Sequence, residues 1–135
     1  MPSKTFAGRF TSLEKIADFI AQAAQKAGFD SKSAYAIQLA VDEACSNIIE
    51  HGYAERENGK ICCNYEVLEN GLKIVIQDWG KSFNPNEVPK PNFEVALEDL
   101  KPRGAGLYFM KEIMDEVNFE FDNKDGNLLT MIKRK

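Results

Sequence analysis

Two segments in the first half of the chain carry apolar residues at helical spacing. The first predicts a helix from Leu13 to Ala27, which Gly28 ends. Thr11 and Glu14 have the spacing of a capping box at the start of this helix. A short strand, Lys4–Phe10, is expected to precede it. Because the next helical segment follows directly, we expect the two helices to pack as neighbours.

The second segment, Asp30–Gly52, predicts one long amphipathic helix. Asp30 or Ser31 can cap its start through a side-chain oxygen, and Gly52 can end it because glycine adopts the left-handed conformation without a Cβ penalty. At about 100° per residue, one arc is apolar and predicts the buried face: Ala34, Ile37, Val41, Ala44, Cys45, Ile48 and Ile49. A second arc is expected to be solvated: Gln38, Asp42, Ser46 and Glu50. A third face, small at its start and polar at its end, allows a ligand to approach closely: Ala36, Ala40, Glu43, Asn47 and His51.

The second half of the chain contains segments with a period of two, which is typical of strands. Two hairpins are predicted, each with a glycine in its turn: Lys60–Leu68 with Leu72–Gln77 through Asn70-Gly71, and Val117–Asp122 with Asn127–Ile132 through Asp125-Gly126. A helix at Leu107–Glu116 separates the hairpins. This order predicts an α+β fold, a two-layer sandwich in which helices cover one face of a mixed or antiparallel sheet.

A long segment between the hairpins, residues 82–103, has four of the five prolines of the chain, interleaved with asparagines. A loop of this length inside a compact domain is usually either functional or disordered. The functional interpretation is a lid over a binding site, with a short helix at Phe93–Leu100. The alternative is a surface excursion without a function of its own.

The composition narrows the class of protein. Lys and Arg number 17 against 21 Asp and Glu, which gives a net charge of −4 and, without a basic stripe, argues against nucleic-acid binding. We find no signal-peptide pattern or membrane-spanning run, and the three cysteines lack metal-binding or redox spacing, so a cytoplasmic location is expected. The 135 residues are enough for one ordinary domain, and we expect a single domain over residues 1–135.

Three sets of residues are candidates for chemistry. Glu43 and Asn47 lie one helical turn apart, where a carboxylate can accept a proton and an amide oxygen suits Mg²⁺, although such a pair more often marks a solvated edge. The period of two places Asp78 on the buried face of its strand, where a carboxylate needs a hydrogen-bonding partner. Capping of the following turn is its commoner role. Gly104–Gly106 precede a helix, where backbone N–H groups favour a phosphate.

Three motifs follow one another in an order that resembles the gyrase, heat-shock-protein-90, histidine-kinase and MutL superfamily of ATP-binding domains, which share the Bergerat fold. Residues 40–53 (AVDEACSNIIEHGY) resemble its N-box, residues 78–85 (DWGKSFNP) its first glycine box, and residues 103–108 (RGAGLY) its second. Within the superfamily, the chain is similar from about Phe10 to Ile132 to the bacterial anti-sigma-factor serine kinases of the sporulation and general-stress-response type.

The resemblance implies a role for each matching residue. Glu43 would be the general base or orienting group for the attacking hydroxyl, and Asn47 would coordinate the Mg²⁺ that bridges the triphosphate of ATP. Asp78 would accept a hydrogen bond from the adenine amino group, and Gly80 would leave room beside the base. The second glycine box would contact the phosphates under the lid at residues 82–103: Gly104, Ala105, Gly106 and Leu107, with Arg103 adding a charge.

The resemblance also implies a function, the transfer of the ATP γ-phosphoryl group to a serine or threonine of an anti-anti-sigma factor. The chain would be a homodimeric anti-sigma factor that binds either its sigma factor or this antagonist. One alternative is a nucleotide-gated module that sequesters a partner without phosphotransfer. Glu43 argues against it, because a binding module does not require a base at this position. A histidine-kinase module would need a phosphoacceptor histidine on a dimerisation helix, whereas His51 lies in the N-box. A gyrase- or MutL-like ATPase would need a transducer domain after residue 135.

Overall fold

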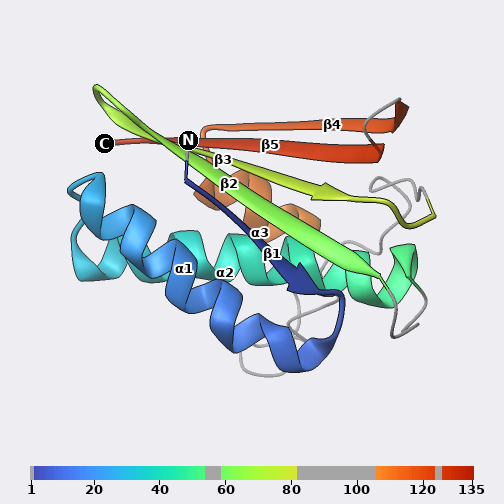
Figure 1. The fold of residues 1–135 in the computed structure, drawn as a ribbon. Coiled ribbons are helices and arrows are strands. Elements are labelled where there is room, and N and C mark those ends of the chain that lie inside the picture. The colour runs from blue at the N-terminus through green and yellow to red at the C-terminus, as the bar shows by residue number, and fades with distance from the viewer. Residues whose placement is uncertain (1, 54–58, 82–105, 124–125) are drawn as a thin grey trace, which may run out of the picture.

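The computed structural model describes residues 2–53, 59–81, 106–123 and 126–135. Its elements follow the order predicted from the sequence (Figure 1): β1 (Ser3–Ala7), a 3₁₀ turn η1 (Phe10–Ser12), α1 (Leu13–Lys26), α2 (Ser31–Asn47), a π-helical turn η2 (Ile48–Gly52), β2 (Lys60–Leu68), β3 (Gly71–Asp78), α3 (Gly106–Ile113), β4 (Glu116–Asn123) and β5 (Gly126–Arg134). The predicted helix at Phe93–Leu100 and the rest of the predicted lid lie outside the described residues.

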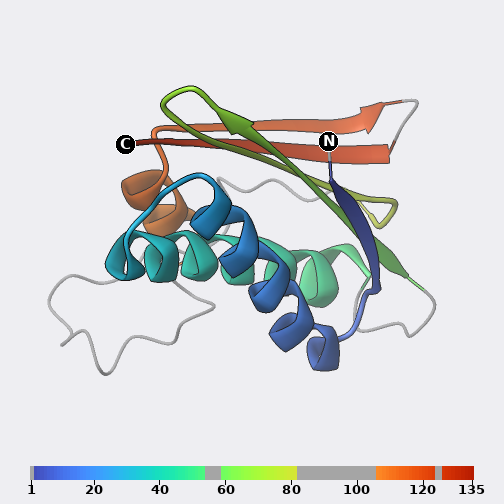
Figure 2. The same cartoon turned by 60° about the vertical axis from the view of Figure 1, so that its left-hand side comes forward.

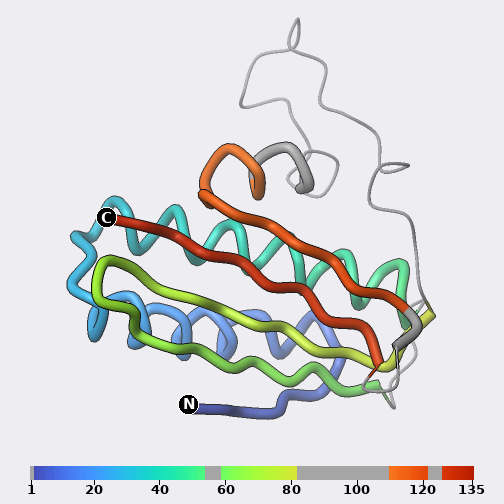
Figure 3. Tube along the Cα trace, turned by 90° about the horizontal axis from the view of Figure 1, so that it is seen from above, coloured from blue at the N-terminus to red at the C-terminus, as the bar shows by residue number. Residues whose placement is uncertain are grey.

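The five strands form one sheet in the order β1-β2-β3-β5-β4, and every neighbouring pair is antiparallel. The helices cover one face of this sheet, so that the described part of the chain has two layers (Figure 2). Seen from above, β1 and β4 are the two edges, and α3 lies near the β4 edge (Figure 3). The expected two-layer α+β sandwich is therefore confirmed, with a sheet that is antiparallel throughout.

The hydrophobic core lies between the layers, where strand alternation meets helical periodicity. In β3, Leu72, Ile74 and Ile76 are fully buried on the face that the helices cover. Six of the seven predicted core positions of α2 and η2 are buried, and Ala34 packs against the core from its margin. The alternation of β3 continues to its last residue, so Asp78 is buried as predicted.

The start of α1 differs from the prediction. The strand ends at Ala7, because Phe10 already begins the 3₁₀ turn that runs into the helix. The predicted capping box of Thr11 with Glu14 does not form. The residue before α1 is instead Ser12, which has helical φ and ψ angles and makes no side-chain cap hydrogen bond. A 3₁₀ turn leading directly into an α-helix leaves no extended residue at which a capping box can form.

Helix α2 is capped as predicted, since Asp30 Oδ1 accepts a hydrogen bond from the Ser33 N–H at 2.8 Å. Its other end differs from the predicted single α-helix to Gly52, because the last turn, η2, is π-helical. Ser46 was expected to be solvated but is only 1% exposed. A period of 100° per residue describes one regular helix in isolation. It predicts neither a change from α-helix to π-helix nor the burial of a residue by other segments of the chain.

Three smaller features complete the description of the fold. Helix α3 ends at Ile113 rather than Glu116, because Glu116 already pairs with Ile132 in the sheet. Cys63 is buried whereas Cys62 is partly exposed, because adjacent residues of a strand point to opposite faces of the sheet. Over the part of the chain that the structure describes, no helix has both the length and the apolar character needed to cross a membrane.

Candidate functional site

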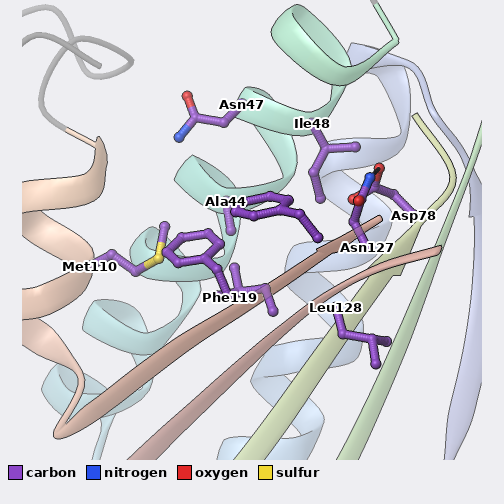
Figure 4. Close-up of a pocket in the computed structure, with 10 residues that line it drawn as sticks. Ala44, Asn47, Ile48, Asp78, Met110, Phe119, Asn127 and Leu128 are labelled. Atoms are coloured by element: carbon purple, nitrogen blue, oxygen red, sulfur yellow. Dashed lines mark hydrogen bonds between the residues drawn. The ribbon is translucent and has the colours of Figure 1, made fainter. Parts of the chain in front are cut away.

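A pocket opens between the helices and one half of the sheet. It lies between α2 and α3 on one side and β3, β4 and β5 on the other, and encloses about 390 Å³ including its open mouth (Figure 4). Its lining is mostly apolar, with three polar side chains: Ala44, Asn47, Ile48, Asp78, Met110, Phe119, Phe121, Asn127, Leu128 and Leu129. Asp78 and Asn127 lie side by side, and Asn47 projects towards α3. Apolar walls with a few polar groups are typical of small-molecule sites.

Asp78 ends β3 and is 5% exposed. Its Oδ1 accepts hydrogen bonds from the Gly80 N–H at 2.9 Å and from Asn127 Nδ2 at 3.1 Å. Burial raises the pKa of this carboxyl group above its ordinary value, and the two hydrogen bonds from Asn127 and Gly80 offset only part of that rise. Both the buried position and the turn-capping role foreseen for Asp78 are therefore present. Both donors bind Oδ1, so Oδ2 is the carboxyl oxygen that can accept a hydrogen bond from a ligand.

Asn127 is a polar pocket residue that sequence analysis missed. It pairs directly with Asp78 across the β3–β5 ladder and is 5% exposed. Its Nδ2 donates both to Asp78 Oδ1 and, at 3.0 Å, to the carbonyl oxygen of Gly80. The sequence showed only an asparagine at the start of a strand after a glycine turn. Its role depends on the register between two strands that are far apart in the chain.

The third face of α2 is buried at Glu43 and Asn47, whereas His51 at its end is exposed. Glu43 is 6% and Asn47 4% exposed, so the solvated edge that such a pair often marks is not what forms here. Asn47 Oδ1 is buried and accepts no hydrogen bond from any described residue. Such an oxygen is rare in proteins unless a ligand, ion or water completes it.

The arrangement at Asn47 fits a Mg²⁺ ion that a nucleotide brings with it. No group of three or more His, Cys, Asp or Glu residues in the described ranges could hold a metal by itself. Mg²⁺ usually takes one or two protein oxygens and completes its shell with phosphate oxygens and water. The buried oxygen of Asn47, which accepts no hydrogen bond from a described residue, has the chemistry of such a ligand.

The first half of the second glycine box falls outside the described residues. Arg103, Gly104 and Ala105 lie there, so their phosphate contacts stay predictions. The backbone of Gly106 begins α3 and Leu107 follows within it, so the box leads into a helix as predicted. Met110 of the same helix lines the pocket. Free N–H groups at the start of α3 would favour an anion there.

Gly80 has a packing reason to be glycine. A Cβ atom at this position would lie 2.7 Å from the carbonyl carbon of Gly52 and 2.8 Å from its oxygen. The adjacent Lys81 N–H donates to the same Gly52 oxygen at 2.7 Å. The first glycine box therefore touches the end of the N-box through the backbone, which the sequence motifs did not show.

Comparison with known proteins identifies the class to which this fold and pocket belong. A family model described as a histidine kinase-like ATPase domain matches residues 6–133, so the chain belongs to the histidine kinase-like ATPase family. A crystal structure of the RsbU and RsbW domains of a Mycobacterium tuberculosis protein has a similar fold, with a TM-score of 0.64 at 15% identity over 99% of this chain and 32% of that chain. The histidine kinase domain of a blue-light activated kinase from Erythrobacter litoralis aligns with a TM-score of 0.56 at 16% identity, over 92% of this chain and 59% of that one.

More similar sequences are found among proteins named serine-protein kinase RsbW. The protein of Bacillus licheniformis is 32% identical over 104 residues, which cover 74% of this chain and 65% of the relative. The protein of Bacillus subtilis strain 168 is 31% identical over 116 residues, which cover 82% of this chain and 70% of the relative. The chain thus spans about two thirds of the length of these relatives. These similarities confirm the family that the three motifs indicated.

Proposed function

We propose that this protein is a protein serine/threonine kinase that uses Mg²⁺-ATP and acts as an anti-sigma factor. The observation that carries the proposal is the buried face of α2, where Glu43 precedes Asn47 by one turn and Asn47 lines a pocket that also contains the buried Asp78. The names of the RsbW relatives support the same activity.

Different residues of the site bind the adenine, the Mg²⁺ ion and the phosphates of Mg²⁺-ATP. Oδ2 of Asp78 accepts a hydrogen bond from the adenine amino group, while Gly80 leaves room beside the base. Asn47 Oδ1 would hold Mg²⁺, which when bound neutralises part of the phosphate charge. The backbone of Gly104, Ala105, Gly106 and Leu107, with the guanidinium of Arg103, contacts the phosphates.

Glu43 acts on the hydroxyl group that receives the phosphoryl group. As the serine or threonine oxygen forms its bond to the γ-phosphorus, the bond from that phosphorus to the bridging oxygen breaks and ADP leaves. The hydroxyl proton passes to the Glu43 carboxylate. General-base catalysis of this kind contributes on the order of 100- to 10,000-fold, and positioning of the phosphates supplies much of the remainder.

The partners follow from the same family resemblance. The phosphoacceptor is an anti-anti-sigma factor of the sulfate-transporter/antagonist type, which competes with a sigma factor for a homodimer of this chain in the cytoplasm. Residues 1–135 form one ATP-binding domain, in which residues 82–103 are the lid. The bound nucleotide biases the choice between the two partners. It can do so only if its affinity differs between the conformations that bind each partner.

Phosphotransfer to a candidate anti-anti-sigma factor tests the kinase activity. Glu43→Gln should lower the transfer rate at least about 100-fold, because the amide cannot accept the proton. Its affinity for ATP, measured by calorimetry, should stay close to that of the wild type. Glu14→Gln, at an exposed position on α1, is the matched control and should change neither quantity.

Two results would each count against a different part of the proposal. Unchanged transfer in Glu43→Gln would remove Glu43 from the chemistry. A wild type that binds ATP and its partners but never transfers phosphate would favour the alternative, a nucleotide-gated module that sequesters a partner.

A further inference from the structure

Tyr53 connects three segments, one of which directly follows Asp78 of the pocket lining. It follows the π-helical turn η2 directly and is 9% exposed. Its hydroxyl donates a hydrogen bond to the carbonyl oxygen of Lys60, at the start of β2, at 2.5 Å. The same hydroxyl accepts a hydrogen bond from the backbone N–H of Trp79, just after β3, at 2.9 Å. One side chain thus links the end of the N-box to β2 and to the first glycine box.

The ring of Tyr53 is held in place by close contact with two glycines. A Cβ atom on Gly59 would lie 2.6 Å from three atoms of the ring, and a Cβ atom on Gly8 would lie 2.9 Å from it. No other residue type leaves room for the ring at these two positions. The position of the hydroxyl is therefore set by packing of the ring as well as by its own hydrogen bonds.

The hydroxyl of Tyr53 holds the peptide group that leads directly out of Asp78. Trp79 N, which it binds, belongs to the peptide that begins at the Asp78 carbonyl carbon. The next N–H, of Gly80, binds Asp78 Oδ1, and the one after it, of Lys81, binds the Gly52 oxygen. Three successive N–H groups thus fix this turn. Two of them bind outside it, to Tyr53 and to Gly52 at the end of η2.

We infer that Tyr53 is a positioning residue that holds Asp78 in the orientation in which its carboxylate receives the amino group of adenine. The π-helical turn is the feature that makes this contact available. The Tyr53 N–H donates to the Ile48 carbonyl oxygen at 2.8 Å, five residues back. This bond closes the wide turn, which ends at Gly52, directly before Tyr53. The inference rests on the proposed function, because it assigns a residue to the recognition of ATP.

The test uses two nucleotides that differ only in the group that Asp78 would recognise. ATP and purine riboside triphosphate, which lacks the 6-amino group, are titrated by calorimetry into the wild type, Tyr53→Phe, Asp78→Asn and the double variant. Tyr53→Phe should weaken ATP about three- to tenfold, the usual effect of one hydrogen bond, and should leave purine riboside triphosphate within about twofold. In the Asp78→Asn background, Tyr53→Phe should have no further effect.

Tyr65→Phe is the matched control. Tyr65 is a buried tyrosine of β2 that, like Tyr53, does not line the pocket. Its hydroxyl accepts a hydrogen bond from Lys26 Nζ at 3.1 Å, whereas that of Tyr53 accepts one from the N–H of Trp79 beside Asp78. Removal of its hydroxyl should alter stability without discriminating between the nucleotides. Equal weakening of both nucleotides by Tyr53→Phe, or no weakening of ATP, would overturn the inference while leaving the proposed function intact. A wild type that binds neither nucleotide would overturn the proposed function, and the inference with it.

A measurement on the unaltered protein gives an independent test. Hydrogen exchange of the Trp79 and Gly80 amides should slow when ATP is added and should slow less with purine riboside triphosphate. Equal exchange with the two nucleotides would contradict a role for this turn in recognising the amino group.

Discussion

Asp78→Asn separates the cost of burying a charge from its use in binding. Both hydrogen bonds to Asp78 come from donors and reach Oδ1, so an asparagine oxygen can accept them in the same place. The other asparagine atom is an NH₂ group, which would face the adenine amino group donor to donor. A hydrogen bond to a charged group contributes about 1.5–3 kcal/mol. We therefore expect ATP to bind roughly 10- to 150-fold more weakly.

Stability should move in the opposite direction. The pKa of Asp78 in the folded protein lies above its ordinary value of 3.8, chiefly through burial, so the folded state binds this proton more tightly than the unfolded state. The stability that the protonated carboxyl contributes is complete below pH 3.8 and is lost as the pH rises through the raised pKa. Asparagine does not titrate and avoids this loss. The advantage of Asp78→Asn should thus be absent in acid, grow across this window and be complete at neutral pH.

Thermal unfolding from about pH 4 to pH 8, followed beside calorimetric titration with ATP, checks both parts. The wild type should also lose ATP affinity as the pH falls through the raised pKa, because the protonated carboxyl is a poorer acceptor. The reasoning is refuted if the variant is less stable than the wild type at neutral pH. It is refuted equally if the variant is more stable but binds ATP unchanged.

Two further predictions concern Asn47 and Gly80. Asn47→Ala should reduce the dependence of ATP affinity on Mg²⁺, because it removes the buried Oδ1; calorimetry with and without Mg²⁺ measures this, and an unchanged Mg²⁺ dependence would contradict the assignment. Gly80→Ala should destabilise the fold by about 1–3 kcal/mol in denaturant unfolding, because its Cβ meets the Gly52 backbone at 2.7 Å. Gly52→Ala is its control, since a Cβ there makes only ordinary contacts from 3.6 Å outward, and a smaller effect of Gly80→Ala than of Gly52→Ala would contradict the packing argument.

The positions of Glu43, Asn47 and Asp78 could be predicted because each follows from a local period. Residues four apart on a helix share a face, and the apolar alternation of β3 fixes the side on which Asp78 lies. Two hairpins with glycine turns, preceded by two helices, were likewise enough to predict the layers. In these cases the sequence nearby determines the answer.

Asn127, Ser46 and Tyr53 could not be assigned in this way, because what surrounds them comes from distant parts of the chain. Asn127 meets Asp78 across a ladder between residues 49 positions apart. Ser46 lies on the arc of α2 that a helical wheel marks as solvated, yet it is buried. The contacts of Tyr53 depend on a π-helical turn, for which the residue pattern gave no signal.

The pairing of β3 with β5 has a consequence for how the protein is made. The pocket is lined by Asn47 of α2, Asp78 of β3 and Asn127 of β5, which is the last of the five strands in chain order. A ribosome adds residues from the N-terminus at about 5–20 per second, so Asn47 and Asp78 are synthesised well before Asn127. Until β5 has emerged and paired, the Asp78 carboxylate lacks its hydrogen bond from Asn127 and the nascent chain has no complete pocket. Nucleotide binding, which stabilises only the folded state, can therefore assist the chain once β5 has paired but not before.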